Sequence, residues 1–420
     1  MKNFLKTLGP GILFASTAIG VSHLVQSTRA GAGYGFTLLW AIALANILKF
    51  PFFEYGSRYA NATGTSLIDG YKKVGNWMLY LYFLITVGTM FFVTAAVGAV
   101  TAGFMDNLFG ISTISNIKML PAILLFVITL GILAIGKFQI LDSMIKVVGV
   151  VLFLSTLTAF FIALYKGPTA DISTAKAPDI WDAANITFLI ALMGWMPTAV
   201  DLSTWNSLWT LERIKTSGYK PTLKETLREF NLGYWISAFL SICFVTLGAF
   251  LMFGTGREMP NGSASFASKV ISLYTDTMGN WSYWIIAASG FSIMFGTSIG
   301  LFDGYARSLE RVGELIFLKK SDVHQNRKPY TIALFITGIG GFLIIWFFSG
   351  NPKGFKLLID IATTLSFLVA PIIAFINYRL VTMRDFPKEA RPGLLMHILS
   401  ITGIVFLTGF SLFFLWTKFF

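Results

Sequence analysis

Apolar segments long enough to cross a lipid bilayer recur along the whole sequence. A transmembrane α-helix needs roughly 20 consecutive apolar residues, whereas a transmembrane β-strand needs roughly 10 with alternating polarity. Only 12% of the 420 residues are charged and 55% are hydrophobic, while soluble chains carry about 25% charged residues. The sequence therefore predicts an all-α integral membrane protein.

Hydrophobicity predicts eleven transmembrane helices, at about residues 9–28, 36–53, 78–104, 118–136, 146–165, 186–210, 232–254, 282–303, 330–349, 356–378 and 394–417. Lys and Arg are concentrated in one set of alternate connections. The positive-inside rule then predicts a multi-pass protein of the plasma or inner membrane, with a cytoplasmic N-terminus and an external C-terminus. The first segment has no cleavage site of the signal-peptide kind, so we expect it to be retained.

The first span carries residues that a lipid-facing helix avoids. Gly20, Ser22 and His23 lie at the centre of the stretch GPGILFASTAIGVSHLVQSTRAGAGYG, residues 9–35. Glycine-rich or polar backbone at membrane depth is tolerated only where it lines a cavity, because unpaired backbone groups in hydrocarbon are costly. The pattern predicts that this helix is interrupted near its middle.

The sixth span shows the same peculiarity. Gly194 and Pro197 bracket Trp195 and Met196 at its centre, and proline both removes a backbone donor and clashes with the preceding turn. Thr198 and Asp201 then have the spacing of a capping box that restarts the helix, with aspartate in place of the usual glutamate.

Two interrupted helices five spans apart are typical of an inverted repeat, with the substrate site where the interruptions meet near the midplane. We therefore predict one transmembrane domain over residues 1–420. Its first repeat covers about residues 9–165, its second about 186–378, and an extra helix about 394–417.

Several motifs resemble those of the Nramp divalent-metal transporters, which share the LeuT-type fold. They are Gly9-Pro10-Gly11, the segment 30–35, the pair Met196-Pro197, and Ser292, Gly296, Thr297 and Gly300 in the eighth span. The resemblance implies a secondary active transporter that alternates access around a central site, with discontinuous helices 1 and 6.

The metal-site residues of that family are replaced in this sequence. The D-P-G-N positions of the first break read Gly20, Val21, Ser22 and His23, and the M-P-H motif of the second has Thr198 in place of histidine. A desolvated divalent cation needs hard oxygen or charged ligands. The departures therefore favour a different substrate, an amino acid or similar small organic solute.

Both substrate classes remain open from the sequence. The turn at Ala18–Ser22 resembles the small-residue turn of amino-acid transporters with this fold. The expected substrate contacts are Gly20, Ser22, His23, Trp195, Met196, Thr198 and Asp201. The alternative is a divalent metal of the Mn, Fe or Mg type, held by the borderline ligand His23 and the soft ligand Met196.

Other polar residues in the spans are candidates for coupling to Na⁺ or H⁺. The hydroxyls of Ser292 and Thr297 predict a Na⁺ site against the first break, and Asp360 is a candidate proton or cation partner. Arg29 is interpreted as a gate or interfacial cation, and Lys49 is expected to snorkel towards the cytoplasm.

The remaining features mostly exclude functions. Basic residues form no continuous patch, so nucleic acid is not an expected partner. No P-loop, HExxH or G-x-S-x-G motif indicates an enzyme or a resident cofactor. The expected partners are the lipid bilayer and the substrate; a monomer fits this architecture, and the sequence leaves the oligomeric state open. Residues 218–231 are expected to form a surface helix, and residues 166–182 an irregular lid.

Overall fold

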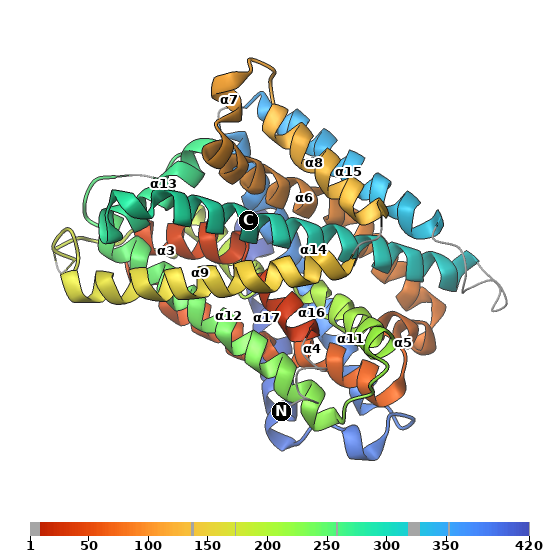
Figure 1. Cartoon of the computed structure of the whole chain (residues 1–420). Coiled ribbons are helices and arrows are strands. Elements are labelled where there is room, and N and C mark those ends of the chain that lie inside the picture. The colour runs from red at the N-terminus through yellow and green to blue at the C-terminus, as the bar shows by residue number, and fades with distance from the viewer. Residues whose placement is uncertain are drawn as a thin grey trace.

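The structure, a computed structural model, describes residues 9–135, 138–172, 174–257, 259–317, 328–351 and 353–419. The helices form one bundle, in which α8 packs with α15 and α9 lies against both α12 and α14 (Figure 1). Within these residues, six helices are long and apolar enough to cross a membrane. The all-α membrane architecture is therefore confirmed.

The bundle is built mainly from long helices. Those that correspond to predicted spans two to five are α4 (Leu39–Thr63), α6 (Asn76–Phe109), α8 (Leu120–Ile135) and α9 (Phe138–Lys166). Those after the sixth span are α12 (Leu223–Met252), α14 (Tyr283–Phe317), α15 (Lys328–Ser349), α16 (Gly354–Thr382) and α17 (Leu394–Phe419). Shorter connecting helices are α5 (Leu67–Val74), α7 (Ile111–Ile114) and α13 (Ser263–Met278), with 3₁₀ turns η3 (Asn280–Ser282) and η4 (Lys388–Ala390).

The first span is interrupted, as predicted. Helix α2 (Pro10–Ala18) is followed by a turn at Ile19 and Gly20, and then by a π-helix, η1 (Ser22–Ser27), and helix α3 (Thr28–Tyr34). A π-helix places side chains off the α-helical register and occurs frequently at functional sites. The interruption therefore consists of a short turn followed by six residues of π-helix.

The sixth span is interrupted over a longer stretch. Helix α10 (Ala183–Gly194) is followed by non-helical backbone at residues 195–199, a 3₁₀ turn η2 (Val200–Leu202), and helix α11 (Ser203–Ser217). Because η1 contacts α10 and α2 contacts α11, the two interruptions lie next to each other. We name them the first break and the sixth break.

Helix α12 holds both halves of the first span through glycine contacts. A Cβ atom added at Gly31 would lie 2.0 Å from the carbonyl oxygen of Val245, and one added at Gly233 would lie 2.2 Å from that of Gly11. Small residues allow such close approach of backbones, which drives helix association in membranes. The halves α2 and α3 are thus fixed against one continuous helix.

Two expectations about connections have different outcomes. Residues 218–231 do not form a separate surface helix, because α12 begins at Leu223 and continues into the bundle. The capping box that starts it is formed by Thr222 and Glu225. The segment 167–182 is irregular in its described part, as predicted.

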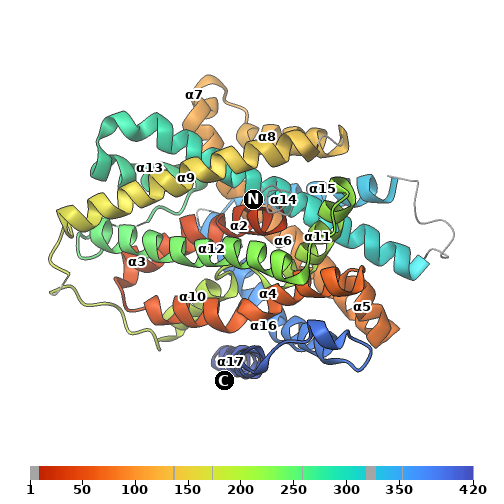
Figure 2. The same cartoon turned by 60° about the horizontal axis from the view of Figure 1, so that its bottom comes forward.

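Both ends of the bundle can be followed in two views. Helices α3 and α13 lie towards the left end, and α5 lies towards the right end (Figures 1 and 2). We call these the α3 end and the α5 end.

Candidate functional site

The side chain of Lys49 occupies the sixth break. Its ammonium donates to the carbonyl oxygens of Met193 at 2.7 Å, Gly194 at 2.8 Å, Met196 at 3.1 Å and Thr198 at 3.3 Å. The residue is 0% exposed. The expectation that Lys49 snorkels to the cytoplasm is therefore wrong, because the carbonyls of the break bind its charge inside the protein.

These contacts satisfy backbone groups that the break leaves without partners. Met193 and Gly194 are the last residues of α10, so no N–H group of the helix donates a hydrogen bond to their carbonyl oxygens. An ammonium has three protons to share among the four oxygens, and a cation at a helix C-terminus also interacts favourably with the helix dipole. Lys49 thus stabilises the interrupted backbone.

Asp201 lies beside this arrangement without a direct bond to it. Its carboxylate is buried, and its Oδ1 atom has no hydrogen-bond partner. The charges of Asp201 and Lys49 attract each other through space. The predicted capping box is wrong, since neither η2 nor α11 has a side-chain cap bond; the sixth break is held by a lysine from another helix instead.

The other side of the sixth break packs on α16. The indole N–H of Trp195 donates to the hydroxyl of Ser366 at 2.8 Å. A Cβ atom added at Gly194 would lie 2.1 Å from the carbonyl oxygen of Thr363. Trp195 and Met196 are both buried, so the break is enclosed between α4 and α16.

His23 in the first break points towards α12. Its Nε2 atom lies 2.9 Å from the carbonyl oxygen of Ser237, and its Nδ1 atom lies 2.7 Å from the hydroxyl of Ser22 and 3.0 Å from the carbonyl oxygen of Ala18. The Ser22 hydroxyl also donates to Ala18. Both ring nitrogens are therefore engaged with protein atoms, and the residue connects the first break to α12.

Gly20 faces helix α14. A Cβ atom added there would lie 2.6 Å from Cγ2 of Thr297, whose hydroxyl donates to the carbonyl oxygen of Ser16 at 2.9 Å. The structure thus brings Thr297 to the last turn of α2, where the Na⁺ site was predicted. Ser292 lies earlier on α14 and is half-buried. Occupancy by Na⁺ stays a prediction.

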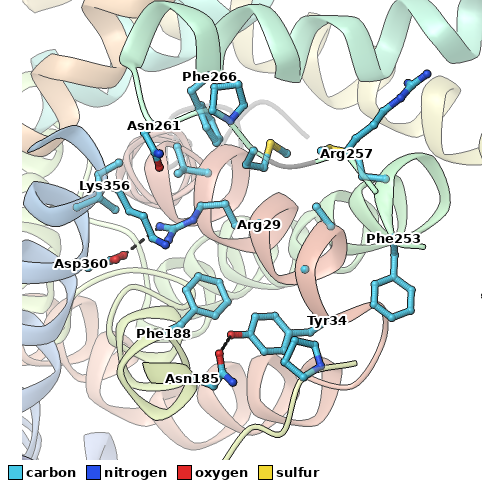
Figure 3. Close-up of a pocket in the computed structure, with 18 of the residues that line it drawn as sticks. Arg29, Tyr34, Asn185, Phe188, Phe253, Arg257, Asn261, Phe266, Lys356 and Asp360 are labelled. Atoms are coloured by element: carbon cyan, nitrogen blue, oxygen red, sulfur yellow. Dashed lines mark hydrogen bonds and ion pairs between the residues drawn. The ribbon is translucent and has the colours of Figure 1, made fainter. Parts of the chain in front are cut away.

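Asp360 pairs with an arginine of the protein itself. Arg29 Nη1 lies 3.0 Å from Asp360 Oδ1 and 2.9 Å from Gln26 Oε1. The guanidinium also lies over the ring of Phe188, 4.9 Å from its centroid. Figure 3 shows Arg29 reaching across from α3 to Asp360 of α16, with Phe188 below it. The pair links the half-helix α3 to α16.

This ion pair lines a cavity of about 830 Å³ at the α3 end. The half-helices α3 and α10 meet at its edge, where the Tyr34 hydroxyl donates to Asn185 Oδ1 at 2.6 Å and the Tyr34 ring stacks on Phe188. Part of the irregular segment also lines it, through Lys176 and Pro178. We call this cavity the vestibule.

Comparison with known proteins identifies the family. The family model described as natural resistance-associated macrophage protein-like, or Nramp, matches residues 11–417. The chain belongs to the Nramp family. Members of this family are transporters, so the chain belongs to a family of multi-pass membrane transporters.

The relatives of this Nramp chain differ in their similarity to it. An uncharacterised protein of Pasteurella multocida is 33% identical over 411 residues, covering 97% of this chain and 91% of that protein. The divalent metal cation transporter MntH of Granulibacter bethesdensis is 24% identical over 209 residues, covering 48% of this chain and 45% of MntH.

Solved structures with the same fold confirm the LeuT-type architecture. A manganese transporter of Eremococcus coleocola superposes with a TM-score of 0.65 at 12% identity, covering 98% of this chain and 86% of that one. MhsT in complex with L-phenylalanine superposes with a TM-score of 0.60 at 14% identity, covering 97% and 98%.

The described part of this Nramp chain holds no group of three or more His, Cys, Asp or Glu side chains able to bind a metal ion together. The residue that fills the sixth break, Lys49, was missed as a site residue in the sequence. A signal was present, because a lysine in an apolar span is costly and by default functional. Its partners, however, are backbone atoms about 145 residues away, which no local pattern specifies.

Proposed function

We propose that this Nramp-family protein is a secondary active transporter of a small organic solute that carries a carboxylate, such as an amino acid. The observation that supports it most is the ammonium of Lys49, which occupies the carbonyl oxygens of the sixth break. Unwound carbonyls at this position are the groups that bind a coupling or substrate cation in discontinuous-helix transporters. In this protein the side-chain ammonium of Lys49 already binds these carbonyl oxygens.

Electrostatics argues against a divalent cation in the same place. At an effective dielectric constant of about 20, a divalent ion within about 4 Å of an ammonium is repelled by about 8 kcal/mol. The Asp201 carboxylate offsets only one positive charge, which Lys49 already supplies. Neutral donors do not offset the desolvation of a divalent ion.

An organic solute with a carboxylate fits the first break better. The helical segment that continues into α3 begins directly after the turn at Gly20, and the N-terminal end of a helix favours an anionic group. The predicted contacts Gly20, Ser22, Trp195, Met196 and Thr198 would then surround the solute, while Lys49 balances its charge from the sixth break.

A second candidate function is transport of a divalent metal. It is favoured by the names of relatives, the divalent metal cation transporter MntH and the manganese transporter of Eremococcus coleocola. His23 would then have to leave the carbonyl of Ser237 to bind a metal.

Uptake into proteoliposomes distinguishes the two. The full chain should take up at least one labelled amino acid or carboxylate, in the presence of EDTA, and should not take up Mn²⁺. Lys49→Met should abolish the organic uptake, whereas the matched variant Lys215→Met, on an exposed lysine of α11, should retain it. Uptake of Mn²⁺ without any organic solute would overturn the proposal.

Orientation and coupling are proposed from the sequence alone, and the same assay tests the coupling. We place the N-terminus in the cytoplasm and the α3 end outside, in the plasma or inner membrane. Uptake driven separately by a Na⁺ gradient and by a pH gradient identifies the coupling ion.

A further inference from the structure

We propose that the vestibule is a binding site for organic anions, in which Arg29 exchanges Asp360 for a carboxylate of the incoming solute. The inference rests on the proposed function and narrows it, because it assigns the solute a net negative charge. It is supported by the charges that line the cavity, by the donors of Arg29 that the protein does not use, and by the ion pair between Arg29 and Asp360.

The charges that line the vestibule are mostly positive. Among the described residues, its basic side chains are Arg29, Lys176, Arg257, Lys353 and Lys356. Its acidic side chain is Asp360. Arg257 is partly neutralised by Asp276, 3.7 Å away, but both side chains of that pair are half exposed, so the pair is weak.

A cavity lined by one sign of charge attracts ligands of the opposite sign. Such a cavity focuses the electric field and raises the local concentration and association rate of a complementary ligand. Lys353 and Lys356 lie at the first turn of α16, where the helix N-terminus adds a positive dipole end. The same field repels divalent cations and raises the local concentration of anions.

Arg29 has hydrogen-bond donors that the protein does not use. A guanidinium carries five N–H donors, and the described contacts of Arg29 with Asp360 and Gln26 both come from Nη1. Its Nε and Nη2 groups therefore remain available on a side chain that is only 12% exposed. These two groups match the bidentate geometry by which arginine binds a carboxylate.

Gln26, which contacts Arg29 but is not among the residues that line the vestibule, carries a second unused donor. Its side-chain Oε1 accepts from Arg29, while its Nε2 is buried without any hydrogen-bond partner. A buried donor without an acceptor is costly. A carboxylate that replaces Asp360 on Arg29 would lie near this donor, because Gln26 and Asp360 both contact Nη1 of Arg29.

The vestibule has the size and walls of a small-molecule site. Its volume of about 830 Å³ lies within the range of ligand pockets, roughly 300 to 1,000 Å³. Phe188 supports the guanidinium from below, and Phe266 lies across the cavity (Figure 3). Apolar walls around a few polar groups are typical of such pockets.

The exchange also explains what the ion pair does. Asp360 competes with an incoming carboxylate for Arg29, and binding of the solute releases the link between α3 and α16. Because α3 directly continues η1, an anion at Arg29 lies on the route to the first break.

Binding to the purified full chain tests the inference. Isothermal titration with L-aspartate and succinate should give binding that weakens as NaCl is raised, because salt screens the field. L-asparagine, of nearly equal shape and no net charge, should bind more weakly. Arg29→Gln should weaken L-aspartate binding roughly 10- to 100-fold.

The variant Asp360→Asn tests whether Asp360 competes with the ligand for Arg29 or only links α3 to α16. Removing the competitor should tighten L-aspartate binding about 2- to 5-fold, whereas loss of a merely structural link would weaken it. Lys353→Gln with Lys356→Gln should flatten the salt dependence, and Lys215→Gln at the α5 end should change nothing. Stronger binding of L-asparagine, or unchanged affinity in Arg29→Gln, would overturn the inference.

The two proposals fail separately. Binding of L-aspartate that depends on Arg29, without uptake of any organic solute into liposomes, would support the anion site and contradict the transport proposal. Organic uptake with an affinity that neither Arg29→Gln nor Asp360→Asn alters would do the reverse.

Discussion

Replacing Lys49 by methionine tests how the sixth break is held. Methionine preserves most of the length and volume of the side chain but removes the ammonium. Four carbonyl oxygens, from Met193, Gly194, Met196 and Thr198, then lose the ammonium as a donor, and that of Met193 keeps only the long bond from the Met196 N–H at 3.4 Å. The nearby carboxylate of Asp201 loses the charge that balances it.

The expected cost follows from these contacts. Three protons of the ammonium are removed, and each buried acceptor left without a donor costs about 1–3 kcal/mol. Relaxation of the non-helical backbone recovers part of this, so we expect a loss of about 3–5 kcal/mol, the range for breaking a buried charge interaction.

Thermal unfolding of the detergent-solubilised protein measures the effect. Lys49→Met should lower the melting temperature by about 3–6 °C, because the unfolding entropy of a 420-residue chain makes each kcal/mol worth only about 1 °C. Lys215→Met, on an exposed side chain, should leave it nearly unchanged. Adding Asp201→Asn to Lys49→Met should recover part of the loss, because the second change removes the carboxylate charge that the first leaves unbalanced.

Two results would refute this reasoning. One is a Lys49→Met variant with the same melting temperature as the wild type, which would mean that the carbonyl oxygens find other donors at no cost in free energy. The other is a double variant whose loss equals the sum of the two single losses, which would mean that Lys49 and Asp201 do not interact.

Two further predictions concern the first span. Gly31→Ala should destabilise the protein by about 1–3 kcal/mol, because the new Cβ would lie 2.0 Å from a backbone oxygen of α12. Gly33→Ala should be nearly neutral, because its Cβ would have no atom within 4 Å. Equal melting temperatures of the two variants would contradict this. His23→Ala should cost about 1–3 kcal/mol by removing the hydrogen bonds of the ring with Ser22 and with the backbone of Ser237, with the KM of uptake unchanged. A large rise in KM at unchanged stability would instead indicate direct contact with the substrate.

The sequence by itself determined the membrane class, most of the span positions and both breaks. Hydrophobicity over roughly 20 residues decides whether a segment enters the bilayer, and this property is local. The breaks were also readable locally, because Gly20 and the pair Gly194 and Pro197 weaken a helix wherever it packs. The pair Met196-Pro197 and the segment Gly9-Pro10-Gly11 resemble Nramp motifs, and the family model confirms that resemblance.

Only the tertiary structure decided which groups meet at those breaks. Lys49 reads as a charge at one end of a span, yet its partners are carbonyls of α10 and the sixth break. His23 reads as a ligand, yet its ring nitrogens contact Ala18, Ser22 and Ser237. The vestibule likewise gathers charges from segments far apart in the chain. Such contacts depend on how the helices pack, and local hydrophobicity fixes the existence of a helix without fixing its neighbours.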